Sequence, residues 1–148
     1  MHSLTYEHNS FLTPKNIPLE KIFLNTKDFQ NRKTEYNEQS VQRIVQSVLE
    51  GNFIFEVFDP ILLWRNAKTD ELFVVSGHSR YEAFKRLNSL SNDADVVQKY
   101  LDIYINTYHG LFSQIPARIL EGKTYEQAKN IAQLSNVLAT PETPIERA

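Results

Sequence analysis

The chain has 148 residues, of which 41% are hydrophobic and 11% aromatic, enough apolar material for the core of one domain. Its 16 Lys and Arg against 18 Asp and Glu give a formal net charge of -2, which excludes a protein held to nucleic acid by bulk positive charge. With no cysteine, it cannot form disulfides, cysteine-ligated zinc sites, iron–sulfur clusters or thiol nucleophiles.

The chain begins with segments that predict an arm, a strand and a loop. Residues 1–16 are polar and aperiodic, which indicates an arm that leads into the fold. The apolar stretch 17–24 predicts a short strand, and the polar residues 25–32 predict a loop after it.

A helix is predicted after this loop. Asn37 is a suitable N-cap, and apolar residues recur with the 3.6-residue period of one helical face from Val41 to Leu49. Gly51 is a typical residue for the end of such a helix. Beyond it, two apolar runs at 61–64 and 72–75 predict a β-hairpin around a polar turn.

The last part of the chain predicts two more strands and a helix. Residues 101–105 alternate between apolar and polar, and the run 115–120 is apolar enough for a strand. Thr124 and Gln127 have the spacing of a capping box at the start of a helix. A further helix start begins at Thr143, too close to the end of the sequence for a stable helix, so we expect a fragment of a longer chain.

The segment expected to carry chemistry is Gly77, between a predicted strand and a predicted helix. Glycine permits a sharp turn and close approach to a ligand, and the free amides and dipole of a helix start favour anions. Arg80 is expected at the surface, where it can grip a phosphate, while His78 and Ser79 can donate hydrogen bonds to it. Ser79 and Glu82 also have capping-box spacing. The alternative is that Gly77 is only a turn residue, Ser79 only a helix cap and Arg80 a solvated surface residue.

Other side chains also have both a functional and a structural interpretation. Four aromatic residues, Trp64, Phe53, Phe55 and Phe58, are compatible with a stacking platform for single-stranded nucleic acid. Basic residues do not interleave with them, which favours core packing. Lys85 and Arg86 add positive charge near Arg80, or are simply solvated.

Four stretches, in order, resemble the N-terminal domain of the ParB/sulfiredoxin superfamily. Residues 17–22 resemble its opening strand, and Gln30-Asn31-Arg32-Lys33 resembles its Q-P-R-K segment. Gly77-His78-Ser79-Arg80 falls where the family has G-E-R-R. Residues 135–148 resemble the box E-N-L-Q-R with its downstream P-I-E-x-A. The resemblance implies an α/β (α+β) fold, a small mixed β-sheet with packed helices, over residues 17–148.

The resemblance further implies a bound nucleoside triphosphate, CTP or ATP, with Mg²⁺. Asn136 matches a metal ligand of the family, but Ser135 stands where the family has a glutamate, so the carboxylate that Mg²⁺ prefers is missing. The positions carried over as nucleotide ligands are Gly77, His78, Ser79, Arg80, Arg32 and Gln30.

The function implied is that of a ParB-like nucleotide-binding module, working with DNA in the maintenance of plasmids, phages or other mobile elements. The nucleotide is expected to change how the domain associates with itself or with DNA, and DNA readout is expected from a region after residue 148. No apolar run approaches the ~20 residues of a membrane span, and there is no signal peptide, so we expect a cytoplasmic protein without a membrane partner.

Enzymatic functions remain open in this superfamily, including nucleotide hydrolysis and the activity of a ParB-like nuclease. Sulfiredoxin is rejected, because His78 replaces the cysteine of its G-C-H-R-Y-E-A signature and the chain has no other thiol. A free-serine kinase carries the similar G-H-H-R, but it needs a carboxylate base, for which Glu20 and Glu35 are the candidates. A second alternative is a degenerate interaction domain that binds neither nucleotide nor metal, which Ser135 in place of the metal-binding glutamate keeps open.

Overall fold

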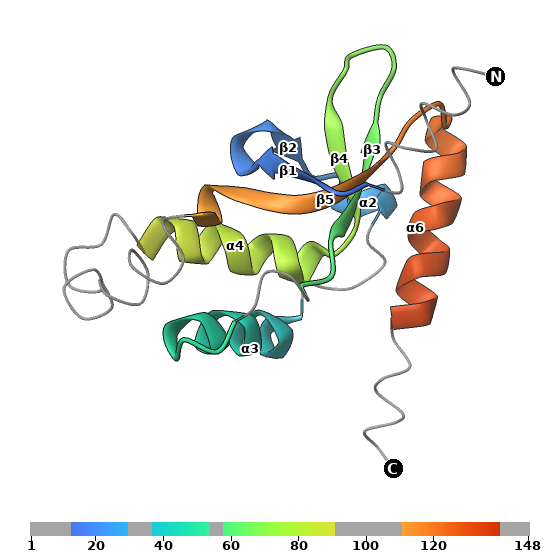
Figure 1. Ribbon diagram of the computed structural model, residues 1–148. Helices are drawn as coiled ribbons and strands as arrows, with labels where there is room; N and C mark the ends of the chain where they lie inside the picture. The colour runs from blue at the N-terminus through green and yellow to red at the C-terminus, as the bar shows by residue number, and fades with distance from the viewer. Residues whose placement is uncertain (1–12, 30–36, 54–57, 91–110, 140–148) are drawn as a thin grey trace.

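The computed structural model describes residues 13–29, 37–53, 58–90 and 111–139 (Figure 1). Within them, strands and helices form a mixed α/β arrangement. In chain order, the elements are β1 (Lys15–Pro18), the 3-10 helix η1 (Leu19–Lys21), β2 (Ile22–Phe23), α2 (Thr26–Phe29), α3 (Glu38–Leu49), β3 (Ile61–Arg65), β4 (Leu72–Ser76), α4 (His78–Leu90), the 3-10 helix η4 (Leu111–Ser113), β5 (Gln114–Leu120) and α6 (Tyr125–Ala139).

The five strands form one curled sheet in the order β1-β5-β3-β4-β2. β3 runs parallel to β5 and antiparallel to β4, while the edge strands β1 and β2 are antiparallel to β5 and parallel to β4, respectively. The two edge strands are joined by the three residues of η1, so the sheet must curl until its edges approach each other.

The prediction of one strand over residues 17–24 is therefore wrong. The segment divides at Leu19, whose buried side chain begins η1, and the two halves join opposite edges of the sheet. The polar loop predicted next is also interrupted, because Phe29 at the end of α2 is fully buried. Neither break has a local sequence signal strong enough to override the apolar pattern around it.

The predicted helix at 37–51 is confirmed as α3, including both of its ends. The side chain of Asn37 accepts a hydrogen bond from the backbone N–H of Ser40 at 3.1 Å. At the other end, Gly51 has φ +79°, the left-handed conformation that commonly stops a helix. The capping box of α6 is also confirmed, since Thr124 and Gln127 exchange side chain–backbone hydrogen bonds of 2.9 and 3.1 Å.

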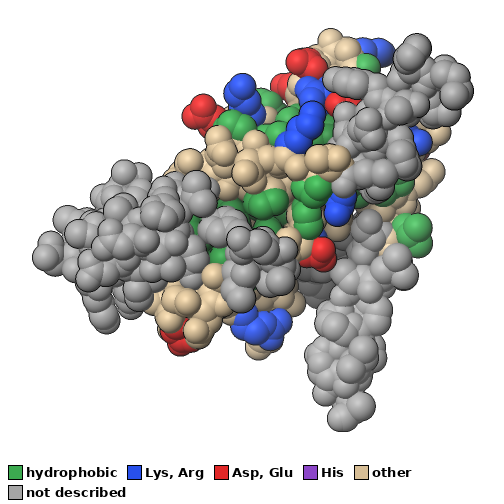
Figure 2. Space-filling model, viewed as in Figure 1, with side chains coloured by type: hydrophobic (Ala, Val, Ile, Leu, Met, Phe, Trp, Pro, Cys, Tyr) green, Lys and Arg blue, Asp and Glu red, His purple; other side chains and the backbone are tan. Residues whose placement is uncertain are grey.

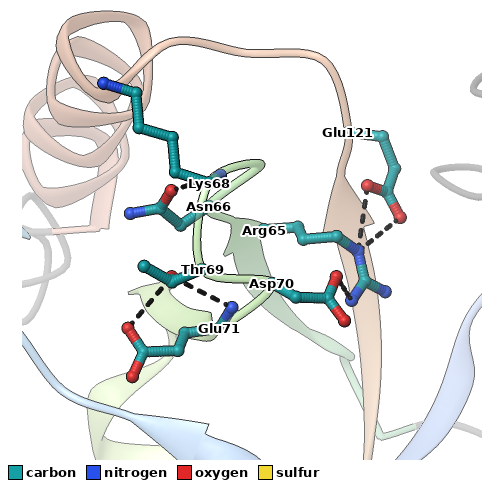
Figure 3. A network of polar contacts seen from close by, with 7 residues as sticks. All are labelled: Arg65, Asn66, Lys68, Thr69, Asp70, Glu71 and Glu121. Atoms are coloured by element: carbon teal, nitrogen blue, oxygen red, sulfur yellow. Dashed lines mark hydrogen bonds and ion pairs between the residues drawn. The ribbon is translucent and has the colours of Figure 1, made fainter.

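The hairpin of β3 and β4 is confirmed, and its turn is held by polar contacts (Figure 3). The side chain of Asn66 accepts the N–H of Lys68 at 2.9 Å. Arg65, the last residue of β3, donates from Nε to both carboxylate oxygens of Glu121 and from Nη1 to Asp70 at 3.1 Å. Because Glu121 directly follows β5, these bonds tie the hairpin to the neighbouring strand.

The core lies on both faces of the sheet. On one face, α3 and α4 contribute side chains such as Val48 and Phe84 to the larger cluster, and on the other α2 and α6 cover Trp64 (Figure 1). Trp64 is 4% exposed and its Nε1 donates to the carbonyl of Lys123 at 2.8 Å. The core interpretation is thus confirmed for Trp64, and Phe53 and Phe58 pack against the larger cluster.

Several expectations fall outside the described residues: most of the arm, the strand at 101–105 and the helix start at Thr143. The extent of the domain, 17–148, stays a prediction; the first strand begins at Lys15. None of the helices in the described ranges is long and apolar enough to cross a membrane.

Candidate functional site

The predicted junction of strand, glycine and helix is present between β4 and α4. Gly77 has φ +101°, a conformation that residues with a side chain rarely adopt. Its carbonyl accepts the N–H of Tyr81 at 2.9 Å, so Gly77 holds the N-cap position and α4 begins at His78. The predicted capping box of Ser79 and Glu82 is therefore wrong, because Ser79 already lies inside the helix.

Close packing around Gly77 leaves no space for a side chain. A Cβ atom built at this position would lie 2.6 Å from Cγ2 and 2.9 Å from Cβ of Ile61, and 3.0 Å from Nη2 of Arg80. Ile61, the first residue of β3, thus packs directly against the backbone of the turn, and so does the guanidinium of Arg80.

Arg80 does not extend into solvent as predicted. Its Nη1 donates to the carbonyls of Asp59 and Pro60 at 2.6 and 2.9 Å, and the side chain is 24% exposed. These bonds hold the segment that enters β3 against the start of α4. Arg80 therefore has a structural role that the sequence does not indicate, since nothing in a sequence marks a backbone carbonyl as the partner of a distant arginine.

The positive charge of Arg80 is poorly compensated. Across the described ranges, its sole acidic neighbour is Asp59, whose carboxylate is 3.9 Å from Nη1 and whose side chain is 92% exposed. Loss of hydration lowers the pKa of the Arg80 guanidinium below its ordinary value, and Asp59 offsets this in part. All hydrogen bonds of Arg80 to described residues come from Nη1, so Nε and Nη2 have no hydrogen-bond partner among those residues.

Ser79 connects the turn to the start of α3. Its hydroxyl oxygen accepts the backbone N–H of Asn37, the N-cap of α3, at 2.8 Å. The N-termini of α3 and α4 are therefore adjacent, and the positive ends of two helix dipoles lie at the same place. This arrangement favours a negatively charged group near Ser79.

Farther along α4, the basic charge is already matched. Arg86 makes two hydrogen bonds of 2.8 Å to the carboxylate of Glu38 on α3, and its Nε donates to Glu82 at 3.0 Å. Lys85 is 3.9 Å from Glu82 and lies over the ring of Tyr81. The positive charge expected from Lys85 and Arg86 is thus engaged within the domain.

The contact of Glu38 with Arg86 predicts a specific dependence of stability on pH. Hydrogen bonds from Arg86 and then Gln42 lower the pKa of Glu38 to about 2, from an ordinary value of 4.5. A depressed pKa stabilises the fold fully above the unfolded value, and this contribution is lost as the pH falls from about 4.5 to about 2. We expect urea denaturation, followed by Trp64 fluorescence, to show a steeper loss of stability over this range for the wild type than for Glu38→Gln. Parallel profiles would contradict the assignment.

The remaining predicted site residues differ in how the structure places them. His78 is 5% exposed and packs into the interior at the first position of α4, which leaves it little surface for a ligand. Gln30 and Arg32 lie outside the described residues. Asn136 belongs to the last part of α6, beyond the described side chains. Among the described residues, no three His, Asp or Glu side chains gather as a metal site would require.

Comparison with known proteins supports the fold. No protein-family model matches the chain. No curated protein matches it. Among solved structures, the chain is similar to the C-terminally truncated chromosome-partitioning protein ParB from Caulobacter crescentus complexed with CTP-gamma-S, with a TM-score of 0.50 and 21% sequence identity. The match covers 84% of this chain and 53% of that one, so the chain spans about half the length of the partitioning protein. The expected ParB-like fold is confirmed.

Proposed function

We propose that this domain binds the phosphates of a nucleotide at the β4–α4 junction and acts as a ParB-like nucleotide-binding module. The observation that carries the proposal is Arg80: its side chain is 24% exposed, its guanidinium lies beside the turn, and its acidic neighbour among the described residues, 3.9 Å away, is the solvated carboxylate of Asp59. An anion at the junction would add a countercharge for Arg80 and would accept hydrogen bonds from backbone N–H groups in the first turn of α4.

The groups at the junction are of the kinds that bind phosphate. Gly77, with φ +101°, lets the chain turn sharply from β4 into α4, and the packing against its Cα brings Nη2 of Arg80 beside the turn. Ser79 supplies a hydroxyl, and Arg80 supplies Nε and Nη2, which have no hydrogen bond to a described residue. His78 contributes to the position of the helix start. Gln30 and Arg32 complete the proposed ligand set from the preceding segment.

A nucleotide is the proposed source of the phosphates because a protein of the same fold was crystallised with CTP-gamma-S. CTP is therefore the first candidate and ATP the second. Magnesium is proposed only as a companion of the nucleotide, with Asn136 as its protein ligand, since the described residues provide no acidic cluster for it.

The proposed biological setting is a cytoplasmic protein that maintains a plasmid, phage or other mobile element. DNA association would come from a region after residue 148. Nucleotide binding would change self-association of the domain or its affinity for DNA. On the face drawn in Figure 2, basic and acidic side chains of the described residues are interspersed, which agrees with weak intrinsic affinity of this domain for DNA.

Calorimetric titration with CTP, ATP, GTP and ADP, each with and without Mg²⁺, tests the proposal. We expect CTP to bind and inorganic tripolyphosphate to compete with it, because the junction contacts phosphates rather than the base. Binding of ATP or ADP without CTP would favour a kinase of the free-serine type and justify a substrate screen. Absence of binding by all four nucleotides would reject the proposal and favour an interaction domain.

A further inference from the structure

The hydroxyl of Ser79 can form a further hydrogen bond that no described residue takes up. A serine hydroxyl can donate one hydrogen bond and accept two. In the described part of the protein, Ser79 accepts one bond, from the N–H of Asn37 at 2.8 Å, and its own hydrogen has no acceptor. This hydroxyl lies in the first turn of α4, two residues after Gly77. It is therefore next to the place proposed for the anion.

We infer that Ser79 couples occupancy of the junction to the start of α3, by donating to a bound phosphate while it accepts from Asn37. This inference rests on the nucleotide binding proposed above. A hydroxyl that donates to a charged oxygen becomes a better acceptor, because neighbouring hydrogen bonds polarise one another. The phosphate would therefore strengthen the Asn37–Ser79 bond. By thermodynamic linkage, that bond strengthens phosphate binding by the same factor.

Asn37 is well placed to transmit this effect. Its backbone N–H reaches Ser79, while its side chain accepts from Ser40 and its carbonyl accepts from the N–H of Val41 at 3.0 Å. A tighter bond at the N–H thus acts on the residue that caps the first turn of a 12-residue helix. One hydroxyl connects the proposed site to the whole of α3.

A separate contact keeps α3 attached when Ser79 is changed. Arg86 binds Glu38 through two hydrogen bonds of 2.8 Å, two turns farther along α4 and away from Gly77. Removal of the Ser79 hydroxyl should consequently loosen the start of α3 without detaching the helix. The coupling can therefore be measured in a folded protein.

Hydrogen exchange detected by NMR on the full chain, with and without CTP and Mg²⁺, tests the inference. In the wild type we expect CTP to slow exchange of the Asn37 and Ser40 amides by about fivefold, the lower end of usual couplings between two sites. In Ser79→Ala, CTP should bind about fivefold more weakly and should no longer slow these amides at saturation. Ser79→Thr, which retains a hydroxyl, should restore both effects.

The matched control is Ser89→Ala, the same change at an exposed position of the same helix, which should behave as the wild type. Unchanged exchange at Asn37 in a wild-type protein that binds CTP would overturn the inference and leave the proposed function standing. Absence of CTP binding by calorimetry would reject both CTP as the ligand and the coupling inferred for it.

Discussion

Replacement of Gly77 by alanine is expected to lower the free energy of unfolding by about 3 kcal/mol, the sum of backbone strain and overpacking in a closed site. The strain arises because φ at this position is +101°. Overpacking arises because the added methyl would lie 2.6 Å from Cγ2 of Ile61. Ile61 is fully buried in the core, so it cannot move aside cheaply.

The same substitution should abolish nucleotide binding even where the protein remains folded. The new Cβ would lie 3.0 Å from Nη2 of Arg80, so the guanidinium would have to give way at the point where the proposed phosphate contacts it. Urea denaturation followed by the fluorescence of Trp64 measures the first effect, and calorimetry with CTP below the unfolding transition measures the second.

Gly51→Ala is the matched control for this prediction. Gly51 also has a positive φ, +79°, but a Cβ there would have no atom within 4 Å. This control should therefore show the strain alone, about 1 kcal/mol, with unchanged CTP affinity. Equal losses of stability in the two variants would contradict the role of close packing at Gly77.

The parts of this fold that the sequence predicts correctly are those that local physical chemistry determines. The start of α3 follows from the side chain of Asn37, and the start of α6 from Thr124 and Gln127. The hairpin follows from two apolar runs around a polar turn. The glycine between β4 and α4 is likewise visible in the sequence, because each element that it joins has its own apolar pattern.

The parts that it misses depend on contacts between distant segments. The apolar stretch 17–24 divides because its two halves pair with strands at opposite edges of the curled sheet. Ser79 has the sequence context of a cap, yet its hydroxyl accepts from a residue 42 positions earlier. Arg80 has the context of a surface cation, yet it holds two backbone carbonyls. In each case the partner is set by tertiary packing, for which the local pattern contains no signal.

Substitutions of Arg80 separate its structural contact from its proposed ligand contact. In Arg80→Ala, the carbonyls of Asp59 and Pro60 lose a charged donor, and we expect the free energy of unfolding to fall by about 2 kcal/mol. CTP binding should be lost in the same variant. Arg43→Ala removes an exposed guanidinium from α3 and should change stability by less than about 0.5 kcal/mol, with CTP affinity retained.

Arg80→Lys distinguishes the two roles more sharply. The single ammonium of lysine can donate to both carbonyls in place of Nη1, which should restore most of the stability. It then has no equivalent of Nε and Nη2 for the phosphates, so CTP should still bind at least about tenfold more weakly than to the wild type. Wild-type affinity in Arg80→Lys would place the phosphates away from the guanidinium. Wild-type stability in Arg80→Ala would show that the carbonyl contacts do not hold the entry to β3.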